Sequence, residues 1–259
     1  MTENLQGSSL TEQTNSGRLP QIEVYSDLHC PWAYLAVFRL RQLWPDYAEK
    51  LEIQWRSLSL EYINRRGTPK TILDLEFDVM KQIEPDLPVK PWSRPDSEWP
   101  VTIWPAFEAL ECAQAQGSQP AFELSWELRR AFFEDSHSLS LRSEIFNMAR
   151  KIGGESGLDQ DRLEADWDCG RYKQNVIRDS QRGWHELKVK NSPTFVLPDG
   201  QQFANPAAGE LKLDLKTHAV ISYTPPEENW VTVYRTFLDA AANSQPDTTA
   251  EVPTATSLD

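Results

Sequence analysis

Residues 22–34 constrain the fold more than any other part of the chain. Their first half alternates apolar and polar residues and is rich in β-forming types, which predicts a strand over residues 21–26. Pro31 then stands where a helix would begin, and apolar residues recur at helical spacing until Pro45. Cys30 is therefore expected at a helix N-terminus, where the helix dipole and free N–H groups stabilise a thiolate. The pKa of such a thiol falls to roughly 3.5–7.5 from about 8.5.

A second alternating stretch, residues 51–56, predicts another strand, so the chain opens as β-α-β with two parallel strands and a right-handed crossover. Many prolines predict irregular structure over much of residues 61–104. Helices are predicted over residues 70–82, 105–116, 120–134, 141–152, 159–168, 171–188 and 226–242. A turn at Pro198-Asp199-Gly200 joins a predicted strand at 194–197 to a returning strand at 202–204.

This order of elements predicts an α/β fold, in which an all-helical subdomain is inserted into a small sheet domain. We assign the sheet domain to residues 21–60 and 189–242, and the inserted subdomain to residues 61–188. Residues 1–20 and 243–259 contain few large apolar side chains and are predicted to be disordered tails.

Charge and composition exclude several classes of partner. The formal net charge of −13 argues against nucleic acid and anionic lipid, because both bind clustered Lys and Arg. The N-terminus lacks the basic region and apolar run of a secretory signal, and no stretch has the length of a membrane span. Three scattered cysteines and four histidines match no metal-ligand spacing. We therefore expect a cytoplasmic protein with reduced thiols and no metal; the sequence does not indicate an oligomeric state.

Two short motifs carry a resemblance to a known group. Cys30-Pro31-Trp32-Ala33-Tyr34 after a strand, with Ser192-Pro193-Thr194-Phe195-Val196 much later, resembles the DsbA-like branch of the thioredoxin superfamily. That branch includes dithiol–disulfide isomerase-type proteins, 2-hydroxychromene-2-carboxylate isomerases and kappa-class glutathione transferases. Residues 130–134 and 157–159 resemble its inserted helices, and the resemblance covers roughly residues 21–205. It implies a thioredoxin-like fold with an inserted helical subdomain.

The resemblance also implies roles for individual residues. Cys30 would be the nucleophile, and the Ser192–Pro193 peptide bond would be cis and close to the Cys30 sulfur. The Ser192 backbone would then pair with an extended peptide or with glutathione. The implied substrate-binding residues are Pro31, Trp32, Ser192, Pro193 and Thr194. His29 is a candidate modulator, which would lower the thiol pKa or carry a proton.

Ala33 departs from the pattern of the disulfide oxidoreductases in this branch. They have a second cysteine there, which resolves the mixed disulfide, so the C-P-W-A variant predicts a monothiol enzyme whose mixed disulfide is released by an external thiol. Cys112 lies in mid-helix and is expected to serve packing. Cys169 adjoins a helix break and is a candidate remote resolving thiol, although disulfide geometry is demanding.

The leading hypothesis is a thiol-dependent disulfide oxidoreductase or isomerase that uses Cys30 to form mixed disulfides with a protein or with glutathione. One alternative is a glutathione-dependent isomerase or transferase that acts on a small aromatic or electrophilic substrate. Another is a non-catalytic thioredoxin-like binding module. No tightly bound cofactor is expected, and glutathione is a candidate co-substrate.

Overall fold

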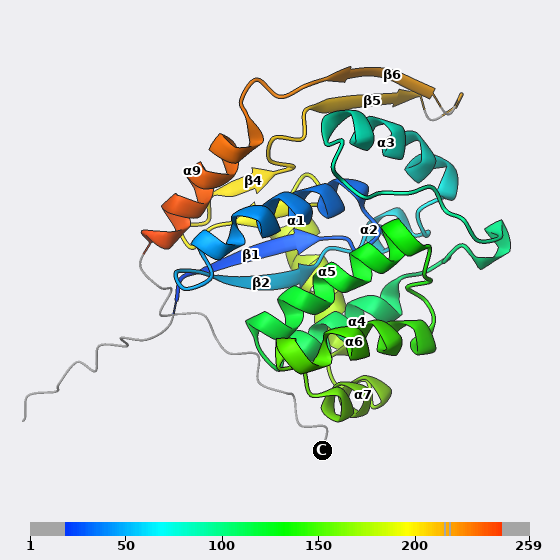
Figure 1. Cartoon of the computed structure of the whole chain (residues 1–259), viewed down its shortest axis with the longest axis vertical. Helices are drawn as coiled ribbons and strands as arrows, with labels where there is room; N and C mark the ends of the chain where they lie inside the picture. The colour runs from blue at the N-terminus through cyan, green and yellow to red at the C-terminus, as the bar shows by residue number, and fades with distance from the viewer. Residues whose placement is uncertain (1–18, 215, 218, 245–259) are drawn as a thin grey trace, which may run out of the picture.

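The computed structural model describes residues 19–214, 216–217 and 219–244 (Figure 1). The predicted tails therefore lie outside the described residues, except for 19–20 and 243–244. At the N-terminal end the described chain is already fixed, because Pro20 is buried and its carbonyl accepts the Glu52 N–H at 3.0 Å.

A four-stranded mixed sheet forms the centre of the fold. Its strand order is β2-β1-β3-β4, with β1 parallel to β2 and antiparallel to β3, and β3 antiparallel to β4. The strands are β1 (Gln21–Ser26), β2 (Glu52–Ser57), β3 (Thr194–Val196) and β4 (Gln202–Ala204). The predicted parallel opening pair and the predicted hairpin are both confirmed.

Helices cover both faces of this sheet, as an α/β fold requires. Helix α1 (Pro31–Leu43) follows β1 and packs beside the last helix, α9 (Trp230–Ala242). Between β2 and β3 the chain forms the inserted helices: α2 (Leu60–Asn64), α3 (Lys70–Ile83), α4 (Trp104–Gln114), α5 (Ser118–Asp135), α6 (Arg142–Ser156), α7 (Gln160–Asp168) and α8 (Lys173–Gln181). The chain also forms two short 3₁₀ turns, Trp44–Asp46 and Asp96–Glu98, and one π-turn, Arg182–Glu186. The predicted helical block is thus present between β2 and β3 in the chain (Figure 1).

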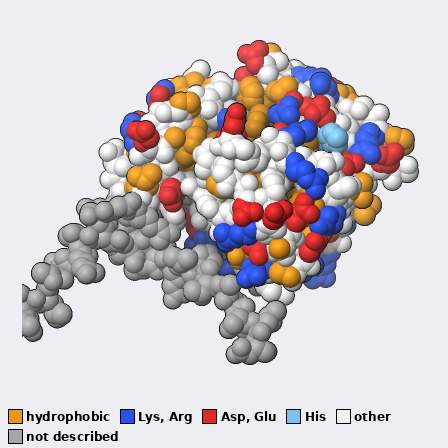
Figure 2. Space-filling model, turned by 60° about the horizontal axis from the view of Figure 1, so that its bottom comes forward, with side chains coloured by type: hydrophobic (Ala, Val, Ile, Leu, Met, Phe, Trp, Pro, Cys, Tyr) orange, Lys and Arg blue, Asp and Glu red, His pale blue; other side chains and the backbone are white. Residues whose placement is uncertain are grey.

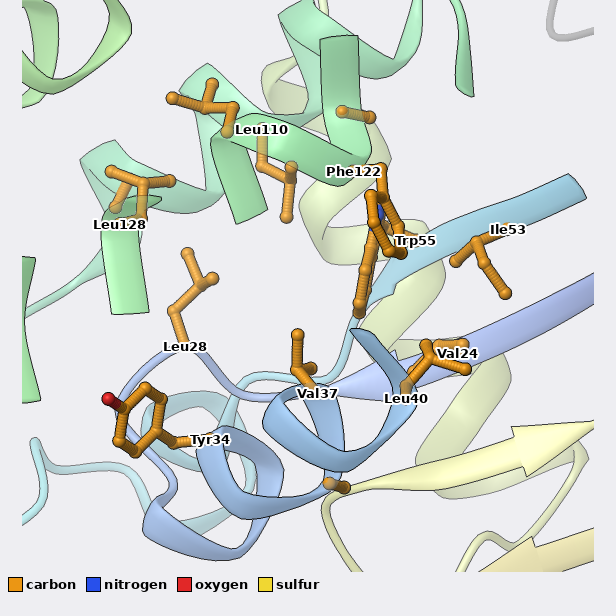
Figure 3. Packing of buried hydrophobic residues seen from close by; sticks show 14 of the residues in the cluster. Val24, Leu28, Tyr34, Val37, Leu40, Ile53, Trp55, Leu110, Phe122 and Leu128 are labelled. Carbon is orange, nitrogen blue, oxygen red and sulfur yellow. The ribbon is translucent and has the colours of Figure 1, made fainter. Parts of the chain in front are cut away.

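The two faces of the sheet bury different sets of side chains. Ile22 and Val24 of β1 join the main core, which also contains residues of α1, α4, α5 and α9. Figure 3 shows Trp55 of β2 lying between this sheet face and Phe122 of the helical block. Tyr25 points to the opposite face, into a smaller cluster beside the π-turn. Successive side chains of β1 therefore point to opposite faces of the sheet, so Ile22 and Val24 join one core and Tyr25 joins the other.

The π-turn approaches the second face closely because it contains Gly183. A Cβ there would lie 2.6 Å from the Leu58 side chain and 2.9 Å from that of Tyr25. Both distances are below van der Waals contact, so a larger residue would push the turn away from the sheet.

Several element predictions are corrected by the structure. A hairpin of β5 (Glu210–Asp214) and β6 (Ala219–Thr224), which was not predicted, packs near α3. The five-residue α2 was also missed. Helix α6 continues beyond residue 152, its predicted end, through Gly153 and Gly154, and stops before Gly157, which has a left-handed backbone. The helix predicted over residues 171–188 changes type along its length, because α8 ends at Gln181 and passes directly into the π-turn, which ends at Glu186.

The surface seen in Figure 2 mixes acidic and basic side chains. Within the described part of the chain, every helix is too short or too polar to cross a lipid bilayer.

Candidate active site

Cys30 lies in the turn between β1 and α1 and caps the helix. Its backbone is extended, with φ −89° and ψ 119°, and its carbonyl accepts the Tyr34 N–H at 3.0 Å. Pro31 occupies the first helical position, where it has no N–H to leave unpaired. The sulfur is thus at the positive end of α1, as predicted, but the residue is only 6% exposed.

The Ser192 carbonyl lies directly against the sulfur. The Cys30 thiol donates to Ser192 O at 3.1 Å, although 162 residues separate the two in sequence. The Ser192–Pro193 bond is cis, as predicted. Ser192 Oγ also accepts the Asp27 N–H at 2.8 Å, so the segment before β3 is tied to the turn that carries the thiol.

The predicted low pKa of Cys30 is wrong for this structure. Burial, the largest cause, and the Glu76 carboxylate raise the pKa of the thiol from 9.0 to about 12. The Ala33 backbone and the Ser192 side chain favour the thiolate, but they have smaller effects than burial. Cys30 is therefore a protonated thiol at neutral pH while the site stays closed.

Trp32 and Glu76 close one side of the site. Trp32 is half-buried, and its indole N–H donates to Glu76 Oε1 of α3 at 3.2 Å. Burial raises the pKa of Glu76 to about 7, while the bond from Trp32 lowers it. Trp32, an implied substrate-binding residue, lies at the boundary between α1 and α3 and packs partly buried against the main core.

Asp27 joins the turn before Cys30 to the start of the inserted helices. Its carboxylate accepts the His29 N–H at 2.6 Å and the Leu60 N–H at 2.7 Å. Burial raises the pKa of Asp27 to about 6, and these two bonds and the Arg129 charge act against that rise. Asp27 is therefore predominantly a carboxylate at neutral pH.

His29 is a neutral, buried ring. It packs against Phe132 at 4.3 Å and Trp99 at 5.1 Å between ring centroids, and its Nε2 has no hydrogen-bond partner. Burial lowers the pKa of His29 to about 3. The expectation that a positive His29 lowers the thiol pKa is therefore wrong; a part in carrying protons remains a prediction.

Pro193 and Thr194 belong to the sheet side of the site. The Pro193 carbonyl accepts the Asn205 N–H at 2.9 Å. Thr194 is fully buried, and its hydroxyl donates to Asn191 O at 2.7 Å. The Thr194 side chain thus faces its own turn, and a direct contact with a substrate would need this turn to open.

A small recess lies beside the Cys30 turn. It has a volume of about 190 Å³ with its open mouth included, and its lining includes Asp27, His29, Glu61 and Gly67. Gly67 is required there, because a Cβ would lie 2.2 Å from the Val101 carbonyl oxygen. The described residues contain no cluster of side chains that could hold a metal ion.

Arg129 was not identified from the sequence. It lies on α5, is fully buried, and donates to Ser26 Oγ at 2.7 Å, next to Asp27. An arginine in a helix usually extends to solvent. Only its position among the apolar residues of 120–134 could have indicated that Arg129 is buried.

The other thiols lie in the helical block. Ala33, buried in the first turn of α1, provides no second sulfur beside Cys30. Cys112 is buried in α4, and burial raises its thiol pKa. Cys169 follows α7, is exposed, and donates to Asp166 O at 3.4 Å. All three cysteines are free thiols.

Comparisons with known proteins identify the fold. No protein-family model and no curated protein sequence matches the chain. A probable DsbA oxidoreductase from Streptomyces coelicolor has a TM-score of 0.58 and 17% identity, covering 90% of this chain and 93% of that one. The cytosolic disulfide reductase DsbM from Pseudomonas aeruginosa, solved with glutathione, has a TM-score of 0.54 and 16% identity, and the match covers 85% of this chain and 99% of that one. A 2-hydroxychromene-2-carboxylate isomerase has a TM-score of 0.53 and 17% identity, and the match covers 71% of this chain and 88% of that one. The chain therefore has a thioredoxin-like fold with a helical insertion, as these structures do and as its motifs predicted.

Proposed function

We propose that this chain, with its DsbA-like fold, is a disulfide oxidoreductase that uses Cys30 as the only reactive thiol of its motif. The observation that carries the proposal is the contact between the Cys30 sulfur and the Ser192 carbonyl, at the positive end of α1. Ala33 supports the monothiol character, because it occupies the first helical turn without offering a second sulfur.

The proposed reaction is thiol–disulfide exchange. The Cys30 thiolate attacks one sulfur of a substrate disulfide, a new S–S bond forms, and the substrate S–S bond breaks. The leaving sulfur departs as a thiolate and takes up a proton. An external thiolate then attacks the mixed disulfide, which releases Cys30 and leaves the external thiol joined to the substrate.

Deprotonation of Cys30 also prepares the binding of a substrate. The thiol donates a hydrogen bond to the Ser192 carbonyl. Deprotonation of the thiol removes this hydrogen bond, and the carbonyl oxygen can then accept one from a substrate. An N–H group of an extended peptide or of glutathione could occupy that position. Substrate binding and thiolate formation would then favour each other, which offsets the high thiol pKa of the closed site.

Glutathione is the external thiol that we propose, in a cytoplasm that keeps thiols reduced. DsbM, a structural neighbour, was solved with glutathione and is described as cytosolic. We propose glutathione as a transient co-substrate rather than a bound cofactor.

The test is incubation of the reduced protein with oxidised glutathione, followed by intact mass and peptide mapping. A glutathione adduct on the Cys30 peptide, reversed by added thiol and missing from Cys30→Ser, is the expected result. Modification confined to the exposed Cys169 would contradict the proposal, since exposure alone would then explain reactivity.

A glutathione-dependent isomerase is the second candidate, because a 2-hydroxychromene-2-carboxylate isomerase shares the fold and this chain has no motif dithiol. In that case Cys30 would only contact or reversibly cap glutathione. Glutathione-dependent turnover of an aromatic or electrophilic substrate that survives Cys30→Ser would favour it. A Cys30 that reacts with neither reagent would favour a binding module.

A further inference from the structure

Arg129 is a buried charge without an ion pair among the described residues. One terminal nitrogen donates to Ser125 O at 3.0 Å and to Ser125 Oγ at 2.6 Å, and the other donates to Ser26 Oγ at 2.7 Å. Its Nε is buried and has no partner. The guanidinium also lies over the Trp55 ring, 5.2 Å from the centroid. Neutral hydroxyls and a ring replace its water only in part.

The surroundings of Arg129 make this charge costly unless an anion is close. It lies within the helical segment that supplies apolar side chains such as Leu128 and Phe132 to the main core. A well-packed apolar side chain would avoid the desolvation of a guanidinium. Burial lowers the pKa of Arg129 to about 10, so the group is still positive at neutral pH.

The acidic groups that interact with Arg129 belong to the proposed active site. The Asp27 carboxylate, and Cys30 when it is ionised, raise the pKa of Arg129 against the effect of burial. Arg129 in turn lowers the pKa of Asp27. Its bond to Ser26 holds it beside the turn that carries both acidic groups.

We propose that Arg129 is a positioning residue whose positive charge offsets that of the Asp27 carboxylate beside the thiol, so that the two charges together set how readily Cys30 loses its proton. The inference rests on the proposed function, because it concerns the thiol which that function uses. Without Arg129, the thiol would face an uncompensated buried carboxylate. With Arg129 but without the Asp27 charge, a thiolate would become the only anion beside the guanidinium.

The groups that bear on Cys30 come from several elements. Asp27 belongs to the same turn, Glu76 to α3 and Arg129 to α5. His29 is neutral above the pKa of about 3 that burial gives it. Glu61 of α2 acts on the turn by raising the pKa of Asp27. Among these groups Arg129 is the one that is positive at neutral pH, so its removal and the removal of Asp27 should act in opposite directions.

The test is a double-mutant cycle read by iodoacetamide alkylation of Cys30, mapped on its peptide so that the other thiols do not interfere. The rate is measured from about pH 6 to 10, a range in which it follows the thiolate fraction. Arg129→Met should slow alkylation about tenfold at neutral pH, and Asp27→Asn should accelerate it about tenfold. The double variant should return close to wild type. Arg129→Lys, which retains the charge without the planar fork, should lie between wild type and Arg129→Met.

Arg39→Met is the matched control. Arg39 is also buried, but it has its own carboxylate partner, Glu84, at 3.1 Å. Its loss should leave the alkylation profile of Cys30 unchanged. If Arg129→Met matches this control, or if it shifts the profile in the same direction as Asp27→Asn, the proposal is wrong.

If Arg129→Met does not fold, Arg129→Lys decides the question. Alkylation slower than in wild type supports a role of the guanidinium, and an unchanged or faster rate overturns it. Alkylation requires no turnover, so the two proposals can fail separately. A correct cycle without a glutathione adduct would refute only the proposed function, whereas an adduct without the cycle would refute only the role of Arg129.

Discussion

Cys30 is subject to two opposing effects, and their sizes decide its state. A helix N-terminus stabilises a negative charge by about 0.3–1 kcal/mol, less than the roughly 1.4 kcal/mol that corresponds to one pH unit. Burial raises the thiol pKa from 9.0 to about 12, so burial is the larger effect. The sequence shows the position of Cys30 in its helix, but its burial depends on the packing of distant parts of the chain such as Ser192.

Ala33→Cys should convert the monothiol site into a dithiol site. Residue 33 lies in the first turn of α1, three positions after Cys30, so the two side chains are neighbours. A tethered thiol resolves a mixed disulfide at a far higher effective concentration than a free one. We expect weak reduction of insulin by wild type and clear catalytic activity in Ala33→Cys. After oxidation, peptide mapping of this variant should show a disulfide between Cys30 and the introduced thiol.

Cys30→Ser in either background is the control for this prediction, and it should abolish the activity. Wild type that already matches Ala33→Cys would show that another thiol, such as Cys169, resolves the intermediate.

At the scale of elements, α3 packs against α1, the helix that begins at the thiol. The indole of Trp32 on α1 donates to Glu76 on α3, and the Glu76 charge disfavours a thiolate at Cys30. The hydrogen bond from Trp32 thus holds in place the carboxylate that favours the protonated Cys30 thiol.

Glu76→Gln should make Cys30 more acidic. The amide retains an oxygen that can accept the Trp32 bond but carries no charge, so one cause of the raised thiol pKa disappears. We expect alkylation of Cys30 to accelerate several-fold at pH 8, with the size set by Coulomb interaction at short range. Asp78→Asn, an exposed change on the same helix, should have no effect. Equal acceleration in both variants would indicate loosening of α3 instead.

The sequence allowed the elements with strong local signals to be predicted. The β-α-β opening has alternating strands and Pro31, and the β3–β4 hairpin has a strong turn signal at Pro198-Asp199-Gly200. The β5–β6 hairpin was missed even though Leu211 and Leu213 alternate with charged residues, because these strands are largely exposed and lack a long apolar run.

Other differences have specific physical causes. Two glycines cost α6 only about 1 kcal/mol each relative to alanine, which packing of its buried residues overcomes. In the site, the cis bond and the contact of Cys30 with Ser192 were predicted from motifs. The burial of Arg129 and the neutrality of His29 depend on distant helices, and local pattern does not reveal them.

At the scale of the whole molecule, buried polar groups join the inserted helices to the sheet. Glu111 of α4 accepts the Ser57 hydroxyl of β2 at 2.7 Å. Burial and the nearby Asp179 raise the pKa of Glu111 to about 8. Its carboxyl is thus protonated in the folded protein over a pH range in which the unfolded chain ionises it.

Glu111→Gln should therefore flatten the pH dependence of stability. The folded pKa lies above the ordinary value of 4.5, so the stabilising contribution of Glu111 is complete below that pH and is lost as pH rises toward about 8. Relative to Glu111→Gln, wild type should lose at least about 1 kcal/mol of unfolding free energy across this window. Urea unfolding at several pH values measures it. Glu155→Gln, an exposed change on α6, should keep the wild-type slope, and a constant offset between wild type and Glu111→Gln would contradict the prediction.

The hydrogen bonds of Asp27 have a consequence for protein engineering. One carboxylate connects the turn that carries Cys30 to Leu60, the first residue of α2, and the inserted helices also contribute Glu76 and Arg129. A minimal scaffold made by excising the insertion would retain Cys30 and Pro193 but would lose the groups that shield the thiol and adjust its acidity. Grafting this chemistry onto another thioredoxin-like protein would therefore require the helices as well as the two motifs.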